Sequence, residues 1–367
     1  MRAALKKDYI VFADPLVEQI CATNWGDGVG ITRKQAARVA DIGTTFRGNS
    51  SITSFDELKY FTGLWGISEN AFRDCSSLIS ITFPDGLPSL GSYCFWGCSS
   101  LTTLSIGTIP NNFTQGSDVF ISTNNVTTIN APTFEDWYRY CLGGDITSEY
   151  NGNGNPLKTN GHLYINGQEL TSKTLSADIT VLPKQLFKGL VNLTSVTILG
   201  NITTIGAGCF RNCPNLVMDI TGEFQSVQTI YHSAFQDSPN ISGTVSLPSL
   251  TGIGEEAFRN TVGITEVANL GTITEIDGQV FYGTSATKIT LPATITTMGY
   301  DSCLTRAHAV VVCLATTPPA ASGSLIYSAY VPYSADHSIL AAYQSASWWS
   351  QMASDIHELD QNGNIPT

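Results

Sequence analysis

Hydrophobic residues return along this chain with a period of about 23 residues. Each copy begins with an aliphatic residue, which is usually followed by a glycine. Two variable residues, a small residue and a phenylalanine come next. A second small residue follows three positions later, as in Leu90 to Cys98 and Ile205 to Cys213. A period in the twenties is typical of solenoids, in which stacked coils bury a core that one coil could not bury alone. The phenylalanines of the copies are Phe72, Phe95, Phe187, Phe210, Phe235, Phe258 and Phe281.

A second hydrophobic pattern lies between these motifs. Aliphatic residues recur there with the spacing of leucine-rich repeats, as in Leu78-x-x-Ile81 and Leu193-x-x-Val196. The intervening positions are mostly Ser and Thr, so the pattern predicts a short strand that turns alternate side chains inward. The sequence therefore predicts a leucine-rich repeat solenoid, rich in β-structure, with roughly eight or nine coils and a small helical cap at both ends.

A glycine follows the aliphatic residue in several copies. Because the chain must turn there, we expect a positive φ angle at this position, which glycine adopts at little cost. The residues concerned are Gly91, Gly206, Gly254 and Gly299.

Helix signals flank and interrupt the repeats. Asp14-Pro15 is a typical helix start, and Thr32 to Gln35 and Ser54 to Glu57 resemble capping boxes. Further helices are expected over 132–142 and from about 334 to 352, the second carrying Trp348 and Trp349, and a loop over 151–156. The predicted segments are an N-terminal helical cap (1–65), a first repeat array (66–130), a helix and loop insertion (131–162), a second repeat array (163–315) and a C-terminal cap (316–367).

Composition restricts the partners. The formal net charge is −12, and a basic groove for nucleic acid is not expected on that background. No stretch approaches 18 uninterrupted apolar residues, so we expect no membrane span. Residues 1–10 carry charges without a following apolar run, so we expect no signal peptide in this sequence.

Nine cysteines raise the question of a metal or redox site. Cys94 with Cys98 and Cys209 with Cys213 occupy slots that other copies fill with Ala, Ser or Thr. Cysteine behaves as a small buried hydrophobe, so we expect buried free thiols. The loop from Asn24 to Ile31 lacks the carboxylates of a calcium site, and Gln35 stands where a Glu ligand would be needed. No metal and no cofactor are therefore expected.

Catalytic chemistry is also not expected. The five histidines fall in different coils or caps, without a recurring acid or nucleophile beside them. Glu255 and Glu256 occupy the two variable positions of a coil, where we expect them to be solvated. The sequence therefore favours a binding protein over an enzyme.

The residue after each phenylalanine is mostly a cation or an aromatic residue. In an acidic protein this row is a candidate stripe for binding an acidic glycan or protein; the alternative is that long side chains only cover the phenylalanines. The candidate stripe comprises Arg73, Trp96, Lys188, Arg211, Gln236, Arg259 and Tyr282.

The chain resembles the BspA-like leucine-rich repeat surface proteins of anaerobic oral and gut bacteria. The resemblance rests on Phe12-Ala-Asp14, Ile20-Cys21, the stretch from Ile52 to Gly63, the coil from Ala71 to Leu78, and Tyr330-Val-Pro332 followed by Trp348 or Trp349. It implies a secreted or cell-surface adhesin that binds a host matrix protein, a glycan or another cell, with no catalytic residues. The alternative function is a structural component of a cell-surface or phage-tail assembly.

Overall fold

The computed structural model describes residues 8–147, 155–157, 160–323 and 326–366. It divides into two compact units, Met1–Asp145 with Tyr150–Leu170 and Ile146–Glu149 with Thr171–Thr367. Both are built from parallel coils, about 13 in all and spaced about 23 residues apart. The predicted solenoid is confirmed, but the predicted eight or nine coils were too few because coils without the phenylalanine motif also join the stack.

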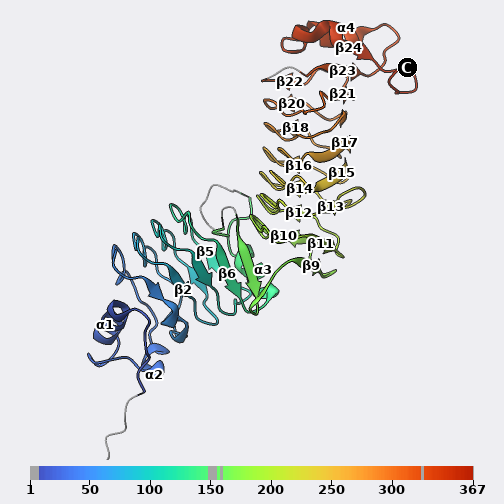
Figure 1. Cartoon of the computed structure of the whole chain (residues 1–367). Coiled ribbons are helices and arrows are strands. Elements are labelled where there is room, and N and C mark those ends of the chain that lie inside the picture. The colour runs from blue at the N-terminus through green and yellow to red at the C-terminus, as the bar shows by residue number, and fades with distance from the viewer. Residues whose placement is uncertain (1–7, 148–154, 158–159, 324–325, 367) are drawn as a thin grey trace, which may run out of the picture. The chain divides into compact units, whose positions relative to one another are not determined.

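The first unit is organised around a six-stranded sheet, of which β2 and β6 are labelled in Figure 1. The strand order of this sheet is β1-β2-β4-β6-β7-β8. All neighbours are parallel except β7 and β8, which form an antiparallel pair. The strands of this sheet are β1 (Ser54–Phe55), β2 (Ser80–Thr82), β4 (Thr103–Ser105), β6 (Thr128–Ala131), β7 (His162–Ile165) and β8 (Gln168–Glu169), and a second sheet pairs β3 (Ser89–Leu90) with β5 (Thr114–Gln115). The sheet thus begins within residues 1–65, which were predicted to be only a helical cap.

Short helices cover the start of this sheet. Helix α1 (Pro15–Asn24) begins at Asp14, whose carboxylate accepts hydrogen bonds from the next turn, and α2 (Arg33–Ala36) has the predicted capping box between Thr32 and Gln35. The predicted capping box at Ser54 is wrong. Ser54 lies in β1, and the following 3₁₀ helix η1 (Asp56–Tyr60) has no side-chain cap, because Ser54 pairs with Ser80 of the next coil instead.

The insertion contains the expected helix, α3 (Phe134–Leu142), capped by Thr133. Most of the expected loop over 151–156 lies outside the described residues. Strand β7 pairs directly with β6, so the sheet continues across the insertion.

The second unit places a row of two-residue strands on one side of its coils and longer strands on the other (Figure 1). The short strands are β10 (Val181–Leu182), β12 (Thr204–Ile205), β14 (Thr229–Ile230), β16 (Gly252–Ile253), β18 (Glu275–Ile276), β20 (Thr297–Met298) and β22 (Ala320–Ala321). On the other side, β9 (Ser172–Leu175) pairs with β11 (Ser195–Ile198), and a seven-stranded parallel sheet contains β13 (Met218–Asp219), β15 (Ile241–Ser246), β17 (Gly263–Asn269), β19 (Lys288–Leu291), β21 (Val310–Cys313), β23 (Ser328–Val331) and β24 (Ile356–Glu358).

Stacked phenylalanines form the core of both units. The ring centroids of Phe187 and Phe210 are 5.3 Å apart, those of Phe210 and Phe235 are 5.4 Å apart, and the series continues to Phe281. In the first unit, Phe46 and Phe120 extend the predicted stack of Phe72 and Phe95 at its two ends. Burying such a side chain contributes roughly 1.5 to 3 kcal/mol, so the stacks are a main source of stability.

The glycines after the aliphatic residue do not have the predicted positive φ. They allow close approach instead, since a Cβ on Gly206 would lie 2.5 Å from the main-chain nitrogen of Lys184, and one on Gly254 would lie 2.6 Å from that of His232. The left-handed residues stand two positions before and two after the phenylalanine, as in Ser233 and Asp237 around Phe235. These residues make the tight turns on either side of the phenylalanine.

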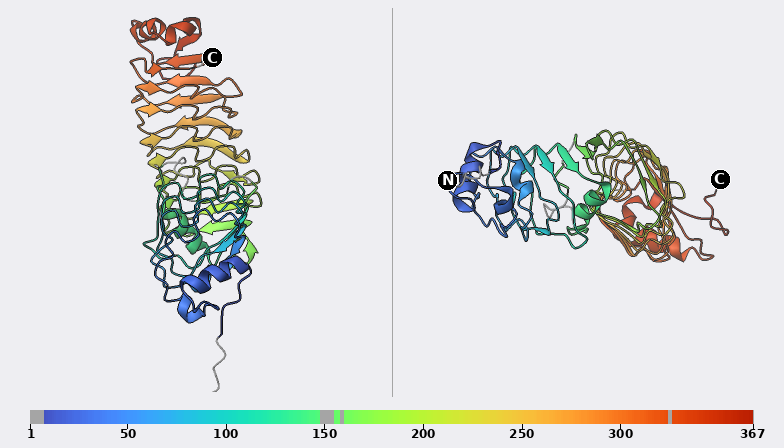
Figure 2. Two further views of the ribbon diagram at one scale, coloured as in Figure 1. Left: turned by 90° about the vertical axis from the view of Figure 1, so that its left-hand side faces the viewer. Right: turned by 90° about the horizontal axis from the view of Figure 1, so that it is seen from below.

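The C-terminal end of the second unit is covered by α4 (Ser338–Ser345) and the 3₁₀ helix η2 (Trp349–Asp355) (Figure 2). The single helix expected over 334–352 is therefore broken. Buried Tyr343 and Trp349 donate hydrogen bonds to the carbonyls of Ala315 and Pro319, each at 2.9 Å. Strands β22 to β24 lie within residues 316–367, so this segment is sheet as well as cap. Within the described ranges, no helix is long and apolar enough to cross a membrane.

Candidate binding surface

The stripe residues of each unit are held in register by main-chain hydrogen bonds between coils. The residue after each stripe residue donates its N–H to the carbonyl of the next stripe residue. Gly189 donates to Arg211 at 2.9 Å, Asp237 donates to Arg259 at 2.9 Å, and Asn260 donates to Tyr282 at 2.8 Å. Successive stripe residues are therefore direct neighbours in successive coils.

In the first unit, Arg73 and Trp96 lie side by side. The Arg73 guanidinium is 4.9 Å from the centre of the Trp96 ring, a cation–π contact. It also donates to Asn70 Oδ1 at 3.2 Å and lies 3.5 Å from the carboxylate of Asp74. Two polar neighbours and one aromatic ring fix the orientation of this cation.

In the second unit, the stripe is more buried than the sequence suggests. Lys188 is only 8% exposed and Gln236 only 3%, whereas Arg211, Arg259 and Tyr282 are half-buried. These three therefore offer most of the accessible surface among the predicted stripe residues of this unit.

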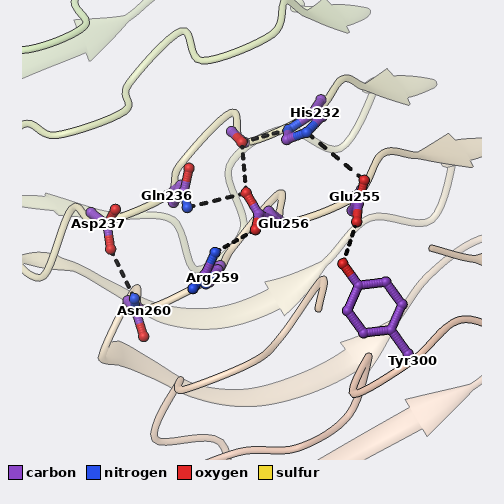
Figure 3. A network of polar contacts seen from close by, with 9 residues as sticks. His232, Gln236, Asp237, Glu255, Glu256, Arg259, Asn260 and Tyr300 are labelled. Atoms are coloured by element: carbon purple, nitrogen blue, oxygen red, sulfur yellow. Dashed lines mark hydrogen bonds and ion pairs between the residues drawn. The ribbon is translucent and has the colours of Figure 1, made fainter. Parts of the chain in front are cut away.

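The prediction that Glu256 is solvated is wrong, because this residue lies at the centre of a polar network (Figure 3). It forms an ion pair with Arg259 and accepts hydrogen bonds from Gln236 Nε2 at 3.2 Å and Ser233 Oγ at 3.4 Å. Its side chain is 16% exposed. The positive charge of Arg259 is thus already paired, which the sequence alone did not indicate.

A serine, a histidine and a glutamate meet beside this network. Ser233 Oγ lies 2.5 Å from His232 Nδ1, and His232 Nε2 lies 3.9 Å from Glu255. A nucleophilic serine must contact its substrate, but Ser233 is fully buried. The arrangement therefore supports the coil turn and provides no accessible nucleophile.

Glu255 also links this coil to Tyr300, which donates a hydrogen bond to its carboxylate at 2.6 Å (Figure 3). That bond raises the pKa of Tyr300 to about 12. Burial raises the pKa of neighbouring Asp277, and the carboxylate of Glu275 adds to the effect. The acids in this part of the coil stack thus interact with one another and with neutral donors.

All nine cysteines are buried free thiols, as predicted. The slot three positions after the phenylalanine also has a polar role in most copies, because its side chain donates to the phenylalanine carbonyl of the preceding coil. Cys98 Sγ donates to the Phe72 carbonyl at 3.1 Å, and Thr261 Oγ1 to the Phe235 carbonyl at 2.8 Å. The slot therefore selects Cys, Ser or Thr for size and for a donor.

The acidic loop near the N-terminus forms a turn. Asp27 Oδ1 accepts hydrogen bonds from the main-chain nitrogens of Val29 and Gly30, both at 3.1 Å, and Oδ2 accepts one from Tyr9. Gln35 is used in the capping box of α2. In the described ranges, no three acidic, histidine or cysteine side chains come together as a metal site.

A pocket of about 320 Å³ opens at the C-terminal end of the stripe, beside Tyr282. Its walls also include Arg306 and Tyr327, which the sequence analysis missed because neither follows a phenylalanine. Asn260, Gly283, Leu304 and Thr305 complete the lining.

Comparison with known proteins identifies the repeat. The family described as the BspA type leucine-rich repeat region matches residues 42–146, 155–242 and 228–306, in six copies. These matches cover well over half of the chain. A search of curated proteins found no significant match.

Solved structures give weaker similarities. A leucine-rich repeat protein from Bacteroides ovatus is 18% identical, with 73% of this chain and 80% of that chain covered and a TM-score of 0.28. A leucine-rich cell surface protein from Faecalibacterium prausnitzii is 17% identical, with 71% and 84% covered and a TM-score of 0.27. Similarity at this level carries no argument about function. The six matched repeats, together with the coils and the stacked core, show that this chain belongs to the BspA-type leucine-rich repeat family.

Proposed function

We propose that this chain is a non-catalytic binding protein of the cell surface or a secreted adhesin, and that its stripe contacts a host matrix protein, a glycan or another cell. The observation that supports this proposal is the row of inter-coil hydrogen bonds that holds the main chain of Arg211, Gln236, Arg259 and Tyr282 in four successive coils of the second unit. A surface whose main chain is fixed in advance loses little backbone freedom on binding. The BspA-type family supports the non-catalytic role.

The spacing of the cations suits a polymeric ligand. Arg211 and Arg259 are two coils apart, which corresponds to roughly 10 Å at a strand separation of about 4.8 Å. Acidic groups repeated along a glycan or an extended peptide could contact both, through charge-assisted hydrogen bonds. Binding of this kind weakens as salt screens the charges.

The test is capture of the purified chain on an array of glycans and matrix proteins. We expect the double variant Arg211→Gln with Arg259→Gln to reduce capture. The melting temperature should fall only modestly, because glutamine can still donate a hydrogen bond to Glu256, the ion-pair partner of Arg259. Glutamine is preferred to glutamate because Glu256 already lies against Arg259, and a second carboxylate there would be repelled.

Lys288→Gln is the matched control, because Lys288 is a half-buried cation on strand β19 that pairs with Glu266 at 3.8 Å and does not belong to the stripe. Full capture of the double variant would argue against the stripe as the binding surface. So would a loss of capture in Lys288→Gln as large as that in the double variant.

A further inference from the structure

We propose that the pocket beside Tyr282 binds one acidic sugar unit of a glycan, with Tyr327 as the stacking platform and Arg306 as the anion contact. The proposal rests on the proposed binding function and names the ligand class and the residues that would select it. It also extends the stripe to residues that do not follow a phenylalanine.

The pocket is formed by successive coils at the C-terminal end of the stripe. Asn260 comes from one coil, Tyr282 and Gly283 from the next, and Leu304 to Arg306 from the coil after that, with Tyr327 completing the wall. Inter-coil bonds fix this order, since Asn260 donates to the Tyr282 carbonyl at 2.8 Å and Gly283 to that of Leu304 at 3.0 Å. A volume of about 320 Å³ lies at the small end of the range for ligand pockets.

Tyr327 has the geometry of a stacking platform. Its ring stacks on the imidazole of His308, with centroids 3.8 Å apart and planes at 18°. His308 is not among the residues that line the pocket, and Tyr327 itself is 51% exposed. An aromatic ring held in this way can pack against the C–H face of a sugar, while its hydroxyl bonds to the polar rim.

Arg306 supplies a cation that is positioned but not neutralised. Its Nε donates to the Gly283 carbonyl at 2.9 Å, which leaves the two terminal amino groups as donors. Among the described residues, it forms no ion pair with a carboxylate, unlike Arg73 and Arg259. A guanidinium in this state is suited to a carboxylate or sulfate group, which it binds with two parallel hydrogen bonds.

The combination of groups favours a sugar over a peptide. A uronate or sulfated sugar has an apolar C–H face, hydroxyls on its rim and one anionic group. These match an aromatic ring, the carboxamide oxygen of Asn260 and the guanidinium of Arg306. The Nδ2 of Asn260 already donates to Asp237 Oδ1 at 2.9 Å. An acidic peptide side chain would use the guanidinium but would leave the tyrosine rings without a partner.

The experiment uses the full chain and three tetrasaccharide probes: tetragalacturonate, a heparin-derived tetrasaccharide and neutral cellotetraose. Binding is measured by titration calorimetry at low and high salt. We expect at least one acidic probe to bind, cellotetraose to bind at least about tenfold more weakly, and Arg306→Gln to remove most of that difference. Tyr327→Ala should weaken both classes of probe, because stacking does not depend on charge.

Matched controls separate the pocket from general effects. Tyr333→Ala removes a partly exposed tyrosine of the same unit, and Lys288→Gln removes a half-buried cation that pairs with Glu266. Neither residue lines the pocket. Both controls should bind the probes as the parent does.

Several results would overturn the proposal. These are no binding of either acidic probe, unchanged binding in both Arg306→Gln and Tyr327→Ala, or equal competition by a poly-glutamate peptide, which would indicate a peptide site. The proposed function is judged separately, since matrix-protein capture that survives these pocket variants would leave it standing. If no glycan or matrix protein on the array captures the parent chain, that result would instead count against the proposed function itself.

Discussion

A hydrogen-bond donor is required at the small residue three positions after most of the phenylalanines. Cys75, Cys213 and Thr261 occupy equivalent slots, and each donates to the carbonyl of the phenylalanine in the preceding coil. The bond lies inside the stack, where an unsatisfied carbonyl would cost free energy. One side chain thus fills space and ties two coils together.

Thr261→Val tests this donor, because valine keeps the shape of threonine and removes the hydroxyl. The Phe235 carbonyl would lose a bond of 2.8 Å inside the core, so we expect a loss of about 1 to 3 kcal/mol in the free energy of unfolding. Thr261→Ser retains the donor and should recover part of the loss in urea denaturation. Equal stability of Thr261→Val and the parent would show that the bond contributes nothing.

Substitution of Phe210 tests the contribution of a single residue to the phenylalanine stack. Its fully buried ring stacks between Phe187 at 5.3 Å and Phe235 at 5.4 Å. Phe210→Ala should lower the free energy of unfolding by about 3 to 5 kcal/mol, because it leaves a cavity in a continuous stack. Phe210→Leu should cost less in the same thermal melts. A melting temperature that stays unchanged in the alanine variant would contradict an internal position for this ring.

At the scale of the element, neighbouring coils can pack closely because glycines stand where their main chains approach each other. A Cβ on Gly206 would lie 2.5 Å from the main-chain nitrogen of Lys184, whereas one on Gly252 would meet only a methyl group of Thr229 at 4.0 Å. Both glycines have negative or extended φ, so the two sites differ in space and not in backbone strain.

Gly206→Ala should therefore destabilise the second unit, because a main-chain atom must move to admit the methyl group. Gly252→Ala is the control, and we expect it to be neutral or slightly stabilising, by up to about 1 kcal/mol, since alanine restricts the unfolded chain. Urea denaturation of the two variants gives the comparison. Equal effects would mean that close packing between coils does not select glycine at this position.

The coils with a phenylalanine motif could be predicted from the sequence because each places an aromatic residue at a fixed spacing. The coils of β23 and β24 could not, since no phenylalanine follows Phe281 and both lie beyond the predicted second repeat array (163–315). Close approach of two main chains also has no direct signature in the sequence. The motif glycines were therefore expected to have a positive φ, whereas they allow a neighbouring coil to approach. The same limit hid Arg306 and Tyr327, which meet Tyr282 only when separate coils stack.

At the scale of the whole molecule, the coils carry nine thiols into the interior of an acidic protein. Burial raises the pKa of Cys75, Cys213 and Cys303 to about 12. It also raises the pKa of Cys21, Cys94, Cys98, Cys141 and Cys313. The unfolded chain has thiol pKa values near 8.5. The native state therefore holds its thiol protons at pH values where the unfolded state releases them.

Alkaline pH should consequently destabilise the fold. A group whose pKa is higher in the folded state stabilises fully below its unfolded pKa, and this contribution falls as pH rises from about 8.5 toward 12. We expect the free energy of unfolding to decline over this window, and a thiol reagent at pH 8 to react only after the chain unfolds. Cys213→Ser keeps the hydrogen-bond donor to Phe187 but does not titrate there, so it should show a shallower decline. A decline as steep as that of the parent, with thiols that react in the native state, would mean that the solenoid interior does not exclude the thiolate.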